Sequence, residues 1–423
     1  MRISYLSRND FPANRSDLNN DLVAGLTVAI VALPLALGFA VTTGMSAAAG
    51  LTTAIIAGLV AALFGGSRYQ VSGPTGAMTV VLIPIVSKYG VKAIPALGLL
   101  AGVFVLIAAA LRLGTIMNKV PWAVVEGFTV GIAIVIALQQ LPLALEIDKA
   151  DGDKTVPIAY QTLRSALEIG MHWQSIAVVA LTLVIKFTYP KLSRNFGFKI
   201  YIPASAVSIL VTTLVVNIFN ISVHTIGEIP RSVGTWAGGD IAFEDFKFLV
   251  LPAFLIAVLA AIESLLSARV ADGMVHAKGT AKYSPNKELI GQGLATIGAS
   301  LFGGMPATGA IARTSVNVRS GAKTRIAAVF HSMTLLIVVF ILAPIISAIP
   351  TAAIAGVLIG ISYRILNPAA IAESLRTTKA EAMVLIITAL VTLFIDLIWG
   401  IVIGILAHFA TVAMNKISKG RKD

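Results

Sequence analysis

The chain has 423 residues, of which 57% are hydrophobic and 12% charged, and its mean hydropathy is +0.90. A soluble domain of this size could not bury so much apolar surface, so the composition predicts an all-α polytopic membrane protein and excludes a soluble globular one. The net charge of +12 suits basic residues beside membrane spans better than a nucleic-acid partner, and the absence of cysteine excludes disulfides and thiolate metal sites. The five histidines are scattered, so no metal site and no cofactor is predicted.

The N-terminal residues 1–21 are polar and of mixed charge, and they are expected to be cytoplasmic. The apolar run that begins at Leu22 continues for about 20 residues, which is too long for a signal-peptide core, so it is predicted to be a retained first helix. Further apolar segments follow along the whole chain. The fourteen predicted spans are 22–43, 46–66, 74–88, 93–113, 121–145, 173–190, 201–219, 248–271, 287–303, 306–318, 323–347, 351–363, 379–395 and 397–415.

One Gly/Pro-interrupted segment occurs twice. Leu63–Gly66 followed by Pro74–Ala77 returns as Leu301–Gly304 followed by Pro306–Ala310. Two such segments in corresponding places predict two homologous halves, here 22–246 and 247–416, with a short C-terminal stub at 417–423. Because each half holds an odd number of spans, seven, the second half enters the membrane from the opposite side, as an inverted repeat does.

The basic residues support this layout. With both termini inside, 24 of the 32 lysines and arginines lie in inside segments, 7 lie outside and one, Arg313, lies within the membrane. The longest outside segments, 146–172 and 220–246, are polar and are expected to be solvated loops. The chain is therefore predicted to be an integral protein of a bacterial-type inner or plasma membrane.

The repeated segments predict an anion site. A half-helix that starts in mid-membrane points unpaired N–H groups and the positive end of its dipole at the bilayer centre, so two facing starts attract an anion. Thr75 and Thr308 can add hydroxyl donors, and Gly76 and Gly309 can let a ligand approach the backbone. The alternative is that the segments are only kinks for helix packing, with Arg313 extending toward the cytoplasm or the lipid headgroups.

Two buried charges stand out. Arg313 lies in the second broken segment, and an ionisable residue inside the membrane indicates a functional site. Glu263 lies near the middle of the eighth span with Ser267 one turn further on, and together they are predicted to bind a co-transported H+ or Na+. The alternative is that Glu263 forms a structural ion pair, for which Arg313 is one candidate partner. Four other charged residues fall near span ends and are expected to be interfacial anchors: Glu126, Lys186, Arg269 and Asp396.

These residues resemble the sulfate permease (SulP) family, whose animal members form solute carrier family 26, from about Asp21 to Ala413. The most specific segments are Glu263–Gly273, Asn286–Gly293 and Phe302–Thr314. The resemblance implies two inverted seven-span repeats arranged as core and gate domains, with short strands leading into half-helices three and ten. It also implies an anion held between spans three and ten, an elevator-like movement of the core, and homodimers.

Carried over by position, the resemblance assigns the span-three lining to Thr75, Gly76 and Ala77 and the span-ten lining to Thr308, Gly309 and Ala310. It makes Arg313 the basic residue of the anion site and Glu263 the acidic residue tied to cation coupling.

Three departures limit the transfer. Members usually continue into a cytoplasmic STAS domain, whereas this chain ends at Asp423, so the resemblance covers the transmembrane domain only. Leu35 follows Pro34 where many members have a polar residue, and Ile311 stands where the sodium-coupled bicarbonate branch has threonine. The loss of that hard oxygen ligand disfavours sodium.

The leading hypothesis is a secondary transporter of a small inorganic anion, sulfate first, with a proton favoured over sodium. Bicarbonate and C4-dicarboxylates stay open as substrates, and an uncoupled exchanger or channel is the second class. An enzyme is not predicted, because Gly321–Thr324 lacks the upstream glycine of a nucleotide-binding loop. The glycine pair at 98 and 102 is expected to seat neighbouring spans.

Overall fold

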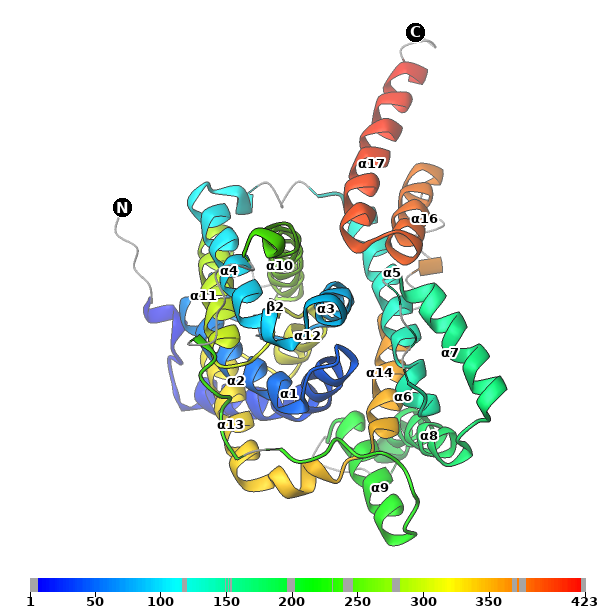
Figure 1. Ribbon diagram of the computed structural model, residues 1–423. Helices are drawn as coiled ribbons and strands as arrows, with labels where there is room; N and C mark the ends of the chain where they lie inside the picture. Colours follow the sequence, from blue (N-terminus) through cyan, green and yellow to red (C-terminus); the bar gives the residue numbers. More distant parts are fainter. Residues whose placement is uncertain are drawn as a thin grey trace. The chain divides into compact units, whose positions relative to one another are not determined.

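The computed structural model describes residues 7–115, 120–148, 150, 152, 154–195, 202–229, 231–238, 246–275, 282–366, 371–372 and 378–419. These residues are mostly helical, and within them seven helices are long and apolar enough to cross a membrane. The elements, labelled in Figure 1, are η1 (Arg8–Asp10), α1 (Arg15–Thr42), α2 (Ala47–Phe64), β1 (Ser72–Gly73), α3 (Gly76–Tyr89), η2 (Val91–Ala93), α4 (Ile94–Ala110), α5 (Trp122–Gln139), α6 (Leu141–Leu145), α7 (Thr155–Ile169), α8 (Trp173–Asn195), α9 (Ala204–Ile218), α10 (Phe246–Met274), α11 (Pro285–Leu301), β2 (Thr308–Gly309), α12 (Ile311–Arg319), α13 (Ile326–Ser347), α14 (Thr351–Leu366), α16 (Lys379–Phe394) and α17 (Leu397–Lys419).

The chain forms two compact units, and each combines segments from both halves of the sequence. Unit 1 comprises residues 1–117, 143–146 and 172–357, and unit 2 comprises 118–142, 147–171 and 358–423. Within unit 2, α5, α16 and α17 pack on one another and α7 packs on α5. Both halves of the repeated motif lie in unit 1, so the candidate site is contained in that unit.

Unit 1 is built on close helix packing around α11, which contacts α2 and α4 (Figure 1). A Cβ added to Gly98 would lie 1.8 Å from Ser300 Oγ, and one added to Gly102 would lie 2.7 Å from the Gly293 carbonyl oxygen. Only glycine fits at these two positions of α4, because the facing helix occupies the space of any side chain. The predicted packing role of this glycine pair is confirmed.

Side-chain caps explain where several helices begin. Asn14 accepts a hydrogen bond from the Asp17 N–H at the start of α1, and Ser46 accepts one from the Ala49 N–H at the start of α2. Such caps satisfy N–H groups that have no partner within the helix. The first helix therefore begins before the apolar run, at Arg15 rather than at Leu22 as predicted.

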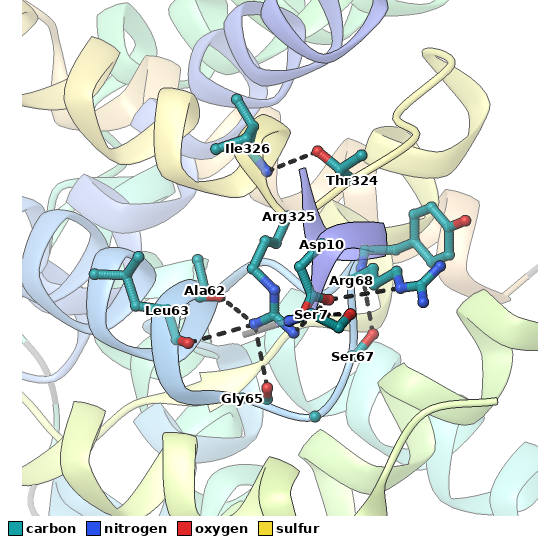
Figure 2. Close-up of polar contacts among 12 residues, drawn as sticks. Ser7, Asp10, Ala62, Leu63, Gly65, Ser67, Arg68, Thr324, Arg325 and Ile326 are labelled. Carbon is teal, nitrogen blue, oxygen red and sulfur yellow. Dashed lines mark hydrogen bonds and ion pairs between the residues drawn. The ribbon is translucent and has the colours of Figure 1, made fainter. Parts of the chain in front are cut away.

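The N-terminal segment is packed into unit 1 and is not simply a solvated tail. Asp10 pairs with Arg325 at 3.0 Å and with Arg68 at 3.6 Å (Figure 2). Arg325 Nη1 also donates to the carbonyl oxygens of Ala62, at 2.6 Å, and Gly65, at 3.2 Å, which lie at the end of α2. These contacts tie η1, the end of α2 and the start of α13 together.

The prediction that residues 146–172 form a solvated loop is wrong. The 146–172 segment contains a 15-residue helix, α7, whose Ile158, Ala159, Thr162 and Ala166 are buried. The prediction failed because the apolar residues of α7 recur at helical spacing within a polar composition, as on an amphipathic helix.

The prediction for Lys186 is also wrong. Lys186 is fully buried in α8 and donates to Ser205 Oγ of α9 at 2.6 Å, so it is not an interfacial anchor.

Candidate functional site

The two broken segments meet through a short antiparallel ladder. Ser72 pairs with Gly309 and Gly73 with Thr308, and the Ala310 N–H donates to the Val71 carbonyl oxygen at 3.1 Å. The ladder confirms the short strands expected before the half-helices. Because α3 begins at Gly76, shortly after β1, and α12 begins at Ile311, shortly after β2, the ladder brings the two helix starts to one place.

Glu263 of α10 reaches this place from a third element. Its Oε2 accepts a hydrogen bond from the Thr308 hydroxyl at 2.7 Å and one from the Thr75 hydroxyl at 2.9 Å. The two hydroxyl oxygens lie 3.1 Å apart. The structure thus brings together the threonine of each predicted lining and the predicted coupling carboxyl, on three different elements.

This arrangement places a carboxylate at two helix starts. Each start carries roughly half a positive charge from its aligned peptide dipoles, and both threonines supply O–H donors. Thr75 is also the N-cap of α3, since its hydroxyl accepts from the Met78 N–H at 3.4 Å. Glu263 is only partly buried, so an anion that reaches the helix starts meets this carboxylate.

Arg313 lies in the first turn of α12 and is 1% exposed. Its Nη2 donates to the Pro74 carbonyl oxygen at 2.8 Å, whereas Nε and Nη1 have no hydrogen-bond partner among the described residues. The guanidinium packs on β1, because a Cβ at Gly73 would lie 2.7 Å from Nη1. Arg313 is therefore held inside unit 1. The packing-kink alternative, in which its side chain extends toward the cytoplasm or the lipid headgroups, does not fit this contact.

The predicted alternative of an ion pair between Glu263 and Arg313 is not observed. No N···O distance of 4.0 Å or less joins the two side chains in the part of the chain that the structure describes. Their opposite charges still attract each other through the buried interior. Each of the two charges is thus held by groups of the broken segments, Glu263 by hydroxyls and Arg313 by a carbonyl.

Ser267 makes a different contact from the one expected. Its hydroxyl donates to Thr314 Oγ1 of α12 at 3.0 Å, and Thr314 Oγ1 accepts from the Val71 N–H at 3.1 Å. Ser264, which the sequence analysis did not single out, accepts from the Gly309 N–H at 2.9 Å. These two serines fix α10 against α12 and β2. Together with Glu263, they give α10 three side-chain contacts with the broken segments.

The role expected of Gly309 also changes. A Cβ there would lie 1.9 Å from Nε2 of Gln70, so the position is packed by a protein side chain. Gly309 is needed for the close approach of Gln70 rather than for the approach of a ligand. Ala77 and Ala310, the remaining predicted lining residues, are both buried beside the helix starts.

The sequence analysis missed a polar layer behind the strands. Four side chains of α11 recur at every fourth residue and are buried: Glu288, Gln292, Thr296 and Ser300. Gln292 Nε2 donates to Ser72 Oγ of β1 at 2.6 Å, and Thr296 Oγ1 donates to the carbonyl oxygen of Ala307 at 3.2 Å. Polar residues spaced by four in an otherwise apolar segment lie on one helix face, and that pattern could have indicated this layer.

Comparison with known proteins identifies the family of this chain. Residues 18–388 match the sulfate permease family. The chain belongs to the sulfate permease family. A relative from Bacillus subtilis, the putative sulfate transporter YvdB, is 35% identical over 403 residues, covering 94% of this chain and 74% of that protein. The bicarbonate transporter BicA of Picosynechococcus is 31% identical, covering 92% of this chain and 69% of that protein.

Solved structures of the sulfate permease family and its relatives share the fold. The transmembrane domain of a cyanobacterial bicarbonate transporter, BicA, superposes with a TM-score of 0.81 at 26% identity and covers 95% of this chain and 99% of that one. The murine Slc26a9 anion transporter in the inward-facing state gives a TM-score of 0.81 at 17% identity, covering 98% and 70%. The protein is thus an integral membrane anion transporter by family, and its relatives carry the names of transporters rather than of enzymes.

Proposed function

We propose that the protein is a secondary active transporter that moves a small inorganic anion, sulfate first, together with a proton. The observation that carries this proposal is the carboxylate of Glu263, which accepts hydrogen bonds from both Thr75 and Thr308 at the paired helix starts. A carboxylate held there occupies the place to which the dipoles and hydroxyls would attract a substrate anion.

Binding follows from the donors around that place. Two half-helix starts supply N–H groups, and the threonines supply hydroxyls. Arg313 adds a buried positive charge whose Nε and Nη1 groups have no partner within the described part of the chain. A tetrahedral dianion can use donors from several directions, which favours sulfate. The substrate-lining roles of Thr75, Gly76, Ala77, Thr308, Gly309 and Ala310 belong to this proposal.

Coupling follows from electrostatic repulsion. At a separation of about 4 Å and an effective dielectric constant of about 20, two negative charges repel by about 4 kcal/mol. Protonation of Glu263 removes that repulsion and releases the two threonine hydroxyls, so the substrate anion and the proton bind together. The same linkage makes the downhill movement of protons drive the anion.

A proton is favoured over sodium as the coupled ion. Sodium needs several hard oxygen ligands, and Ile311 offers no side-chain oxygen at the position where the sodium-coupled bicarbonate branch has threonine. The Ser267 hydroxyl donates to Thr314 and so helps to pack α10 on α12.

The transport cycle and assembly belong to the same proposal and rest on the family resemblance. They comprise fourteen spans in two inverted repeats, core and gate domains, an elevator-type movement, a homodimer, and an inner membrane location with both termini cytoplasmic.

Bicarbonate is the second candidate substrate, because a relative 31% identical carries the name of a bicarbonate transporter. C4-dicarboxylates are retained because helix starts discriminate poorly between oxyanions. An uncoupled exchanger or channel is the alternative mechanism, which the partly buried Glu263 disfavours because a passive pore needs no titratable centre.

The test is uptake by proteoliposomes of labelled sulfate, bicarbonate or succinate, each at two pH values, with and without sodium. We expect accumulation of sulfate against its gradient when the outside is acidic, without a requirement for sodium, and its loss on addition of a proton uncoupler. Downhill flux that is insensitive to the uncoupler would instead establish the channel or uncoupled exchanger.

A further inference from the structure

A buried carboxylate behind the candidate site takes no part in the proposed transport chemistry. Glu288, in the first turn of α11, is 1% exposed. Its Oε2 accepts from the backbone N–H groups of Gly66 and Ser67, both at 2.8 Å, and its Oε1 accepts from Gln70 Nε2 at 2.8 Å and Gln292 Nε2 at 2.9 Å. A carboxylate, which has only acceptors, matches these four donors.

The two glutamines carry the position of Glu288 to both strands of the ladder. Gln292 uses the same Nε2 to donate to Ser72 Oγ in β1 at 2.6 Å. Gln70 packs directly on Gly309 of β2, where a Cβ would lie 1.9 Å from its Nε2. One carboxylate therefore orients one amide against each strand.

Gly65, in the loop between α2 and β1, has two further contacts. Arg325 Nη1 donates to the Gly65 carbonyl oxygen at 3.2 Å (Figure 2), and a Cβ at Gly291 of α11 would lie 2.5 Å from the Gly65 backbone. With Gly65 fixed in this way, the following residues 66–70 take their position from Glu288.

We propose that Glu288 is a positioning residue that sets the separation of the α3 and α12 starts, and thereby the affinity for the anion, without touching the anion. This inference rests on the proposed function, because it names what fixes the geometry of that site. In Glu288→Gln one acceptor oxygen remains for four donors, so either the Gly66 and Ser67 N–H groups or the amides of Gln70 and Gln292 face an NH2 group. The strands then lose part of their lateral support, while the carboxylate of Glu263 itself is unchanged.

The first experiment measures binding and transport of Glu288→Gln in the full chain. We expect the dissociation constant of purified protein for labelled sulfate, and the KM for uptake, to rise about tenfold, while the maximal rate and its dependence on the proton gradient change little. Ser300→Ala on the same face of α11 is the matched control and should leave both constants unchanged. An unchanged dissociation constant in monodisperse Glu288→Gln protein overturns the proposal, and so does loss of gradient dependence with affinity retained.

A rescue variant separates positioning from a general loss of stability. In the double variant Glu288→Gln with Gln292→Glu, the carboxylate moves one turn along α11, where it can accept from the new amide at 288 and from the Ser72 hydroxyl. We expect partial recovery of sulfate affinity. A double variant that is no better than Glu288→Gln, although equally well folded, contradicts the proposal.

A readout without substrate keeps this inference distinct from the proposed function. Because the sequence has no cysteine, Val71→Cys with Ala310→Cys places one thiol beside each strand, at the two residues that the hydrogen bond from the Ala310 N–H to the Val71 carbonyl oxygen joins. We expect rapid disulfide formation in this background and a several-fold slower reaction when Glu288→Gln is added. Equal rates overturn the positioning role even if the protein transports a different anion, whereas slower cross-linking with no sulfate binding in the parent protein refutes only sulfate as the substrate.

Discussion

The hydroxyl of Thr308, at the start of one broken helix, lies 2.7 Å from the carboxylate of Glu263 on a helix that neither broken segment contains. Thr75 completes the contact from the other broken helix at 2.9 Å. The carboxylate is therefore a negative charge held by the groups that the substrate anion would use. This competition for shared donors is the physical basis of the proposed coupling.

Replacing Gly309 tests the packing of the ladder. In Gly309→Ala the new methyl group meets Gln70 at 1.9 Å, so either the amide or β2 must move. We expect sulfate affinity to fall by at least about tenfold in a binding assay on purified protein. Gly298→Ala, whose Cβ would meet its nearest neighbour at 3.4 Å, is the control and should bind normally. Normal binding by Gly309→Ala would show that the ladder is not rigid.

Arg313 should matter for affinity rather than for coupling. Arg313→Ala removes a buried positive charge and the donor to the Pro74 carbonyl oxygen, so we expect the KM for sulfate uptake to rise about tenfold or more. Uptake that remains should still depend on the proton gradient, because Glu263 is intact. Arg319→Ala, at the exposed far end of the same helix, controls for the loss of charge alone. Equal KM values for Arg313→Ala and the parent protein would exclude Arg313 from the anion site.

Asp10 should make stability depend on pH. Burial alone would raise the pKa of its carboxyl, but the Ser7 backbone N–H and the Arg325 guanidinium outweigh burial and lower the pKa below its ordinary value. A carboxyl whose folded pKa is lowered contributes stability that is fully present above its unfolded pKa and is lost as the pH falls through the folded pKa.

We therefore expect Asp10→Asn to lower the free energy of unfolding by about 1.5 to 3 kcal/mol at neutral pH. The difference from the parent protein should shrink as the pH falls below about 4. Thermal unfolding in detergent, followed between neutral and acidic pH, measures this. Asp17→Asn, at a half-buried position in the first turn of α1, is the control for the loss of one negative charge. A difference that is constant down to acidic pH would contradict the role given to the Asp10 charge.

The sequence predicted the pairing of the two broken segments because each carries its own signal, a glycine and proline interruption within an apolar run. It also predicted Glu263 and Arg313, since charge is rare in such runs. It did not predict the supports of the site. Glu288 accepts from residues more than 200 positions away, at Gly66, Ser67 and Gln70. The spacing of polar residues on α11 indicates a polar face, but it does not identify these distant partners.

The wrong prediction for Lys186 and the unexpected contact of Ser267 have the same origin. Lys186 lies near the end of a predicted span, which indicates an interfacial anchor, but α9 supplies the Ser205 hydroxyl as its partner inside the protein. Ser267 lies one turn from Glu263 in sequence, yet Thr314 of α12 takes its hydroxyl. In both places the choice of partner depends on which helices pack together, and that information is not contained in the segment itself.

The most direct measurement is the pH dependence of the dissociation constant for sulfate, compared between the parent protein and Glu263→Gln. Sulfate stays a dianion near neutral pH, so any linkage comes from the protein. Where Glu263 releases its proton, the account predicts that the dissociation constant of the parent protein rises up to about tenfold per pH unit, whereas that of Glu263→Gln stays nearly constant. A parent protein whose sulfate affinity does not change with pH, or a Glu263→Gln variant with the same pH dependence as the parent, would contradict it.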